Sequence, residues 1–364
     1  MSLLATRIDL DAIAHNTRTI KAMVEPAALM CVVKADAYNH GVERVVPVMD
    51  EAGADAFGVA TLAEARRVRT LTDKPVLAWI WALSDDLPVD VELGVPSLAH
   101  MRVLIDDPTP RRIHLMVDTG MNRSGIDEAH WAEAFELAQN APQLEVVGLM
   151  THLACGDEPE SPFNDEQADH FRRAIDQGRA AGLELPVNHL ANTPATLTRS
   201  DLHFDMVRPG VGLYGLEPVA GRAHGLIPAM SWVAKVTVVK PISKGEGTSY
   251  GLTWTAPADG FTAVIPAGYA DGMPRNWQDK IEVTINGHRY PQVGRVCMDQ
   301  IVIWLGDNSR GVDIGDEGVI FGAGGMDATE LAERADTINY EVVCRPNGRT
   351  ERTYVGTGVM AERI

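Results

Sequence analysis

The sequence predicts an α/β protein, in which an N-terminal (β/α)8 barrel of the TIM type (residues 1–228) precedes a mostly-β domain (residues 229–364). Its 364 residues exceed what one ordinary domain of roughly 100–150 residues needs. From about residue 10 to 215, short apolar runs alternate with longer amphipathic segments, as in successive strand–helix units. After Pro228 the long helical patterns stop and Gly-rich turns separate the apolar runs. We therefore expect two domains that meet near residues 215–232.

Eight apolar runs in the first part of the chain have the length of buried parallel strands. They lie at 29–33, 56–59, 76–80, 89–95, 112–117, 146–151, 187–191 and from Met206 to Tyr214. Eight strands with intervening helices close into a barrel, whose catalytic groups stand where strands end and loops begin. In the second part, the runs with β character lie at 231–239, 261–267, 280–285 and 300–304.

The composition excludes several classes of protein. Lys and Arg total 32 against 50 Asp and Glu, and the formal charge of −18 repels nucleic acid and anionic lipid headgroups. The four cysteines form no CxxC pair, which argues against a disulfide framework or a zinc ribbon and fits a reducing cytoplasm. The richest apolar run, at 75–83, is too short to span a bilayer. We expect a cytoplasmic protein without a metal site and without a nucleic-acid or membrane partner.

Lys34 is the sharpest candidate for chemistry. It follows an apolar strand in CVVKADAYNHG (31–41), so its side chain is expected to project into the mouth of the barrel. A lone lysine there would more often be a surface residue. A partly desolvated lysine, however, loses its proton easily and can hold a carbonyl cofactor as a Schiff base.

Four further polar residues stand at or just beyond predicted strand ends, and we expect them to converge with Lys34 on one face of the barrel. They are Arg123, His152, Asn192 and Arg208. Glycines in RPGVG (208–212) would let backbone amides approach a phosphate closely. The constellation suits an anionic cofactor that carries a ring and a phosphate.

The chain resembles the alanine racemase family in its lysine block, CVVKADAYNHG, and in its N-terminal block, IDLDAIAHN (8–16). Further blocks follow in the expected order: VDTGMNRSG (117–125), MTHLA (150–154), NHLAN (188–192), VRPGVGLYG (207–215), TSYGLTW (248–254), PAGYADG (266–272), GRVCMDQ (294–300) and INYEV (338–342). The resemblance covers essentially the whole chain. It implies pyridoxal 5′-phosphate as cofactor, interconversion of L- and D-alanine that supplies peptidoglycan, and a homodimer that shares its active sites.

The resemblance also implies roles for single residues around the cofactor. The phosphate is assigned to Tyr38, Thr193, Gly210, Val211 and Tyr340, with Asn192 in the same cofactor-binding set. Arg208 would face the pyridine nitrogen, and His152 would orient Arg208 by a hydrogen bond. A guanidinium cannot hand a proton to that nitrogen, which favours racemisation over transamination.

Two catalytic bases are implied, because racemisation removes a proton from one face of the substrate and returns it on the other. Lys34 is one, and Tyr250, delivered across the dimer interface, is the second. The substrate is assigned to Arg123, which also contacts the phenolic oxygen of the cofactor, to Tyr269 and to the backbone amide of Met298. Asp299 is expected to support Lys34 or Arg123.

One position departs from the family pattern. Many members carry a carbamylated lysine seven residues before the arginine that corresponds to Arg123, whereas this chain has Met116. A thioether carries no charge, so we expect an anion such as chloride, or a neighbouring acceptor, to hold Arg123. Three alternative functions stay open: a racemase of serine or other amino acids, a decarboxylase of basic amino acids, and a non-catalytic pyridoxal-phosphate carrier.

Overall fold

Seven parallel strands curl around a common axis at the centre of the N-terminal domain. In the computed structural model, which describes residues 2–358, their order is β7-β6-β5-β4-β3-β2-β8. They are β2 (Ala28–Val32), β3 (Ala56–Thr61), β4 (Val76–Ile80), β5 (Glu92–Val95), β6 (Arg111–Met116), β7 (Leu144–Met150) and β8 (Met206–Val207). His189 closes the ring, because its backbone bridges both Met150 of β7 and Met206 of β8. The predicted barrel is confirmed.

Three of the predicted strands are shorter than expected, and the run at 89–95 forms a strand only at Glu92–Val95. The run at 187–191 contributes only the bridging residue His189, and the side chain of Asn188 accepts the N–H of Leu149 in place of a backbone carbonyl, at 3.1 Å. The last strand ends at Val207 instead of Tyr214. Pro209 has no N–H to donate to a ladder, and the chain then winds into the short 3₁₀ helix η3 (Val211–Tyr214).

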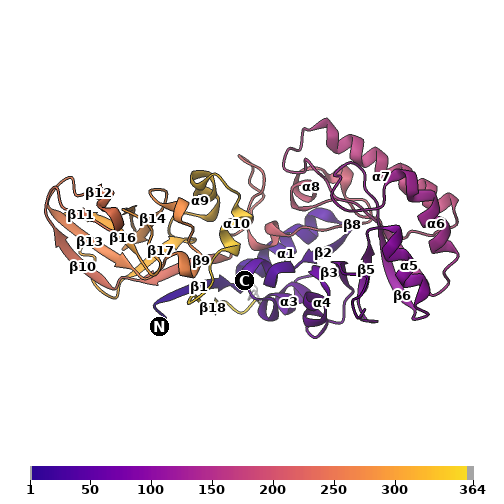
Figure 1. Cartoon of the computed structure of the whole chain (residues 1–364), viewed down its shortest axis with the longest axis horizontal. Helices are drawn as coiled ribbons and strands as arrows, with labels where there is room; N and C mark the ends of the chain where they lie inside the picture. The colour runs from indigo at the N-terminus through magenta and orange to yellow at the C-terminus, as the bar shows by residue number, and fades with distance from the viewer. Residues whose placement is uncertain (1, 359–364) are drawn as a thin grey trace, which may run out of the picture.

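Helices cover the outside of the barrel in the expected alternation (Figure 1). They are α1 (Leu10–Val24), α3 (Val42–Glu51), α4 (Leu62–Arg69), α5 (Leu98–Asp106), η1 (Glu128–His130), α6 (Trp131–Gln139), α7 (Pro162–Ala180), α8 (Thr193–Thr198) and η2 (Ser200–Leu202). Their starts follow local signals. Asp9 caps α1 by accepting two backbone N–H groups, and Thr61 with Glu64 forms a capping box at α4.

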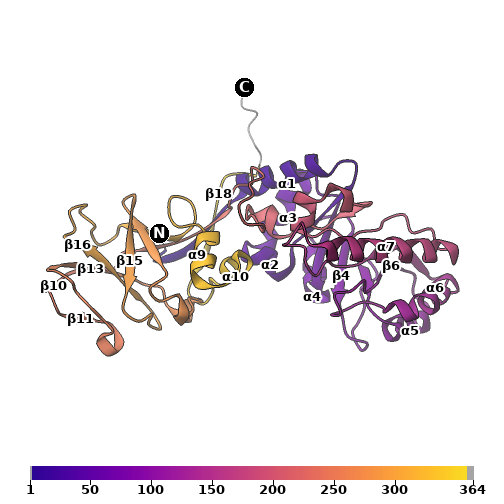
Figure 2. The ribbon, with the colours of Figure 1, turned by 90° about the horizontal axis from the view of Figure 1, so that it is seen from above.

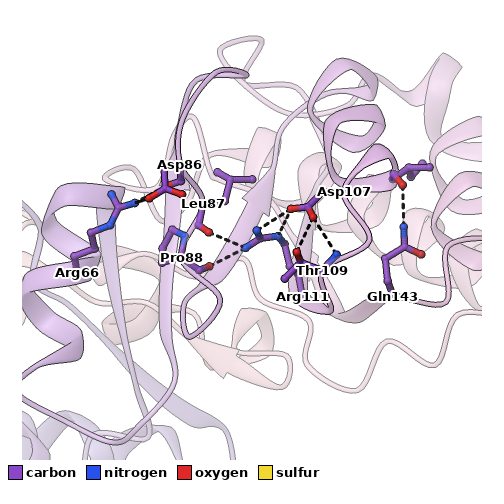
Figure 3. A network of polar contacts seen from close by, with 9 residues as sticks. Arg66, Asp86, Leu87, Pro88, Asp107, Thr109, Arg111 and Gln143 are labelled. Atoms are coloured by element: carbon purple, nitrogen blue, oxygen red, sulfur yellow. Dashed lines mark hydrogen bonds and ion pairs between the residues drawn. The ribbon is translucent and has the colours of Figure 1, made fainter.

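One connection departs from the alternation, because residues 81–91 join β4 to β5 without a helix. A buried arginine donates hydrogen bonds to backbone carbonyl oxygens of this loop. Arg111 is 7% exposed and donates to the carbonyl oxygens of Leu87 and Pro88 at 3.1 and 2.9 Å. Figure 3 shows this network and the contact of Arg66 in α4 with Asp86, the residue before Leu87.

The second domain is built on a nine-stranded sheet with the order β10-β13-β16-β15-β14-β17-β9-β1-β18. Its strands are β9 (Met230–Lys235), β10 (Val238–Ile242), β13 (Gly260–Ile265), β14 (Glu282–Ile285), β15 (His288–Val293), β16 (Ile301–Gly306), β17 (Glu317–Phe321) and β18 (Glu351–Val355). The ninth, β1 (Leu4–Asp9), comes from the N-terminus. We expected these residues in the barrel; they are in this sheet instead, because β1 pairs antiparallel with β9 and parallel with β18.

Two helices, α9 (Ala328–Ala335) and α10 (Asn339–Cys344), lie between the sheet and the barrel (Figures 1 and 2). Helix α10 brings Tyr340 to the barrel mouth, where its ring centroid is 6.3 Å from that of Tyr38. Among residues 2–358, no helix is both long and apolar enough to cross a membrane.

Candidate active site

A cavity of about 420 Å³ opens at the mouth of the barrel, where the parallel strands end. Most of the predicted cofactor-binding residues line it: Lys34, Tyr38, Arg123, His152, Asn192, Thr193, Arg208, Gly210 and Tyr340. Val211 does not line the cavity and is fully buried at the start of η3. Sequence reasoning missed other lining residues, notably Trp79 at the end of β4 and Asp157.

Lys34 stands at the end of β2 with its amine free for chemistry. Among residues 2–358 the amine makes no hydrogen bond or ion pair, and it lies 5.9 Å from the ring centroids of both Tyr38 and Trp79. Burial lowers the pKa of Lys34, and the positive charge of Arg123 lowers it further. Both effects favour the neutral, nucleophilic amine.

The segment that follows Lys34 is a left-handed helical turn, α2 (Lys34–Asn39). Residues 35–39 have φ between 51° and 65°, although none of them is glycine. The left-handed region costs an ordinary residue roughly 1–2 kcal/mol, so the turn exists only because its surroundings hold it. It matters for the site because it sets the direction of both Lys34 and Tyr38.

Polar contacts from both domains hold this turn. Arg352 of β18 donates to the carboxylate of Asp36 at 2.7 Å and to the side-chain oxygen of Asn39 at 2.8 Å. Inside the turn, the buried His40 donates from Nδ1 to the carbonyl oxygens of Ala37 and Tyr38 at 3.0 and 2.8 Å. Burial lowers the pKa of His40 to about 4, so this imidazole is neutral at physiological pH.

On the side of the cavity next to Tyr38, a loop fits a phosphate. The hydroxyl of Thr193 accepts the N–H of Gly210 at 2.8 Å, which fixes the loop before η3. A Cβ on Gly210 would lie 2.2 Å from the phenolic oxygen of Tyr38, so only glycine permits this approach. Asn192 serves here as the N-cap of α8, where its side chain accepts the N–H of Ala195. Hydroxyls, a cradling glycine and nearby cations are the donor set that a phosphate ester requires.

Arg208 is only 6% exposed, and a histidine other than the expected one orients it. Its guanidinium donates to Nδ1 and to the carbonyl oxygen of His189, both at 2.7 Å, and to the carbonyl oxygen of Thr151 at 2.5 Å. The prediction that His152 orients Arg208 is therefore corrected. His152 lines the cavity, and burial, with the positive charge of Arg208 next, lowers its pKa to about 3. His189 lies in the NHLAN block, but only the barrel closure places it against Arg208.

Arg123 lines the cavity as an exposed residue, and among residues 2–358 it makes no hydrogen bond or ion pair. Met116 also lines the cavity and packs inside the barrel near Trp79 and Gly94. No acidic side chain pairs with Arg123 in the described part of the chain, and the anion or acceptor expected for it stays a prediction.

The remaining predicted residues lie on the β domain, outside the cavity. Tyr250, Tyr269 and Met298 are 70%, 43% and 51% exposed. The N–H of Tyr269 donates to the carbonyl oxygen of Cys297 at 3.0 Å, and Ser249 donates to the carbonyl oxygen of Arg295 at 2.8 Å. The loops that carry Tyr250, Tyr269 and Met298 are thus neighbours, and we call these three residues the β-domain cluster.

Asp299 was expected beside Lys34 or Arg123, but within the chain it has a different partner. Its carboxylate pairs with Arg349 at 2.7 Å. Arg349 also binds the fully buried Asp271, whose carboxylate accepts the N–H of Gly268 at 3.0 Å as well. This ion-pair network fixes the loop that carries Tyr269, and no pattern in the sequence indicated it.

A barrel with a free lysine and two arginines at its mouth, joined to a β domain that carries the exposed β-domain cluster, defines a two-domain barrel enzyme. Profiles described as alanine racemase, N-terminal domain, and alanine racemase, C-terminal domain, match residues 8–218 and 229–354. The chain belongs to the alanine racemase family.

Individual relatives match this chain over nearly its full length. An alanine racemase of Corynebacterium efficiens is 62% identical over 366 residues, which cover 98% of this chain and 100% of the relative. The crystal structure of alanine racemase from Corynebacterium glutamicum superposes with a TM-score of 0.90 at 56% identity and covers 98% of this chain and 100% of its own. The alanine racemase of a D-cycloserine-producing Streptomyces lavendulae gives 0.92 at 35% identity, with 98% of each chain covered.

Proposed function

We propose that the protein is a pyridoxal-phosphate-dependent alanine racemase that interconverts L- and D-alanine. The observation that carries the proposal is the cavity at the barrel mouth, in which the unpaired amine of Lys34 stands with the guanidinium groups of Arg123 and Arg208. The names of full-length relatives support the choice of alanine. The proposal includes a cytoplasmic location, which the four free cysteines favour, and a supply of D-alanine to peptidoglycan.

The residues of the cavity fit this cofactor. We assign its covalent attachment to Lys34 and its pyridine nitrogen to Arg208. Its phosphate is assigned to Tyr38, Thr193, Gly210, Val211 and Tyr340, with Asn192 and His152 in the same binding set. When bound, pyridoxal phosphate withdraws electron density from the α-carbon of an attached amino acid and thereby acidifies its α-hydrogen.

Lys34 and Tyr250 of the partner subunit would move the proton. The neutral amine of Lys34 accepts or returns the α-proton on one face of the substrate, and its lowered pKa favours that form. The phenol of Tyr250 of the partner subunit does the same on the opposite face. A phenol gives up its proton more easily with a cation beside it, and the exposed Arg123 is the candidate.

The position of Tyr250 supports a homodimer. Tyr250 lies between β11 (Gly247–Thr248) and β12 (Trp254–Thr255). This ribbon lies at the end of the β domain that points away from the barrel (Figure 1). This location supports a role for Tyr250 in the cavity of a second copy of the chain. The β-domain cluster would complete the cavity of a second copy, where Tyr269 and the amide of Met298 bind the substrate carboxylate.

The alternatives receive less support. The C-terminal family profile matches residues 229–354, and a non-catalytic carrier would have no need of that domain. A racemase of broader specificity and a decarboxylase of basic amino acids would both use Lys34, so only a substrate test separates them from an alanine racemase.

The test is direct. Full-length protein supplied with pyridoxal phosphate is incubated with L-alanine, L-serine or L-lysine, and each D-enantiomer is measured with the released carbon dioxide. We expect D-alanine to form fastest and no carbon dioxide to appear. Absence of D-alanine, or faster turnover of serine or lysine, would overturn the assignment.

The two-base arrangement has its own test. Tyr250→Phe should abolish racemisation, while exchange of the α-hydrogen with solvent deuterium persists from the enantiomer that Lys34 serves, which the family resemblance gives as D-alanine. Equal loss of exchange from both enantiomers would contradict separate bases.

A further inference from the structure

A chain of hydrogen-bonded side chains runs from Arg208 through the interior of the barrel. His189 Nδ1 lies 2.7 Å from Arg208, and His189 Nε2 lies 2.9 Å from Nδ1 of His114. His114 Nε2 lies 2.9 Å from the carboxylate of Glu92, whose other oxygen accepts from Arg112 at 2.8 Å. We call Glu92, His114 and His189 the relay.

The directions of these hydrogen bonds are fixed by counting protons. A guanidinium only donates, so Nδ1 of His189 must present a lone pair to Arg208. His189 then carries its proton on Nε2 and donates to His114 Nδ1, which leaves His114 protonated on Nε2. That proton points at Glu92, which as a carboxylate only accepts. Each imidazole is therefore neutral, in a single tautomer, between a cation at one end and an anion at the other.

The three side chains of the relay are almost completely buried. Glu92 is 7% exposed, His114 1% and His189 0%. Burial raises the pKa of Glu92, but the hydrogen bond from His114 and the nearby guanidinium of Arg112 outweigh this effect and lower it overall. Burial lowers the pKa of His189 well below its ordinary value, with the charge of Arg208 as the next cause. A buried polar chain has one low-energy proton pattern only while every donor keeps its acceptor.

The acceptor at the far end supports that pattern, because it receives the last proton of the chain. Alternate residues of β6 share one face, and Arg112, His114 and Met116 therefore step from the bottom of the barrel to the cavity. Glu92 and Arg112 line a second cavity, of about 270 Å³, at the end of the barrel where the strands begin. The relay thus spans the barrel from this end to Arg208.

We propose that Glu92 is a positioning residue for the reaction, because it fixes the tautomers of His114 and His189 and thereby the orientation of Arg208. This inference rests on the proposed function. Three of the N–H groups of Arg208 go to His189 Nδ1 and to the carbonyls of His189 and Thr151. A guanidinium has five, so two remain for the cavity. Without an acceptor at position 92, His114 can shift its proton to Nδ1 and His189 can present N–H to Arg208, which would push the guanidinium out of place.

The first measurement reads the tautomers directly, by solid-state ¹⁵N NMR of the full-length cofactor-loaded protein labelled in its histidine rings. His114→Asn and His189→Asn identify the signals. In the wild type, both rings should be neutral with the proton on Nε2. Glu92→Leu, which removes charge and acceptor, should produce Nδ1-protonated signal for His114 or His189. Glu92→Gln keeps an acceptor and should retain the wild-type pattern.

The second measurement is the split between kcat and KM for alanine. Glu92→Leu should lower kcat about 10-fold, in line with the loss of groups that orient a directly acting residue, with KM changed less than twofold. Glu145→Gln is the matched control, because Glu145 contacts Arg112 at 3.0 Å from the exposed side and lies outside the relay. It should behave as wild type.

Two outcomes would overturn the proposal: wild-type tautomers and kcat in Glu92→Leu, or equal damage from Glu145→Gln. Failure of the proposed function would look different. A wild-type protein that does not racemise alanine would refute the assigned activity, whereas the NMR pattern reports on the relay independently of that activity.

Discussion

The left-handed turn after Lys34 makes the active site depend on a side chain from the opposite end of the sequence. Five residues, 35–39, have positive φ, which at roughly 1–2 kcal/mol each requires about 5–10 kcal/mol of compensating contacts. Arg352 supplies two hydrogen bonds, one of them to the carboxylate of Asp36. Replacing Arg352 with Met removes both but keeps an apolar stem of similar length.

The expected loss is about 2–3 kcal/mol. Hydrogen bonds that involve a charged group contribute about 1.5–3 kcal/mol each, and the lower end applies here for two reasons. The side chains of Arg352 and Asp36 are 27% and 28% exposed, and Asp36 keeps its ion pair with Arg67 and the N–H of Val42. The remaining contacts should therefore keep the protein folded, with a looser turn.

Hydrogen–deuterium exchange measured on peptides that cover residues 34–42 is the assay, accompanied by urea unfolding. Arg352→Met should speed exchange in this segment roughly 30- to 150-fold, which corresponds to the same 2–3 kcal/mol, and should weaken cofactor retention. Arg345→Met is the control, because Arg345 pairs with Glu341 on the surface of α10 and such pairs contribute about 0.5 kcal/mol or less. If both variants exchange alike, the turn does not depend on Arg352.

The site leads to four further predictions. Borohydride should fix the cofactor on Lys34, and peptide mapping that finds it on another lysine would refute the assignment. Burial, followed by the charge of Arg123, lowers the pKa of Lys34 from its ordinary value of 10.5. Protein stripped of its cofactor should therefore bind the cofactor faster as the pH rises, with a midpoint below 10.5. A midpoint at or above 10.5 would contradict this. Mixed dimers of inactive Lys34→Ala and Tyr250→Phe chains should regain one complete site each, whereas verified heterodimers without activity would place Tyr250 outside the mechanism. Since Met116 cannot carry a carbamate, activity should survive removal of carbon dioxide and bicarbonate. If chloride holds Arg123, exchange of chloride for a larger anion should lower the activity. Reversible loss of activity on bicarbonate depletion would refute the prediction.

Local pattern was sufficient for much of the fold. The alternation of apolar and amphipathic segments predicted the barrel, because a parallel strand buried on both faces needs a continuous apolar run. The change of texture after Pro228 predicted the β domain. Position at a strand end brought Lys34, Arg123 and Arg208 together correctly, because the carboxyl ends of all barrel strands meet on one face.

Local sequence pattern did not predict the contacts between distant segments. Strand β1 has the amphipathic pattern of a strand, but nothing local says that its partners are β9 and β18. The left-handed turn of residues 35–39 contains no glycine, so the sequence did not indicate this conformation, which is held by Arg352 from the far end of the chain and by His40, the next residue. The relay was missed because a polar residue in a predicted strand usually indicates an exposed position. The sequence alone does not distinguish such a residue from one that lies inside a barrel.

The sequence by itself determined the two-domain architecture, the family and the residue types of the cavity, since these follow from short-range periodicity and from motifs that lie within single segments. Only the tertiary structure decided which histidine contacts Arg208, which arginine holds Asp299, and that Tyr250 lies away from the cavity of its own chain. The physical reason is that a hydrogen bond depends on the distance and direction between two side chains. When these come from different strands or domains, only the closure of the barrel and the packing of the sheet fix that geometry.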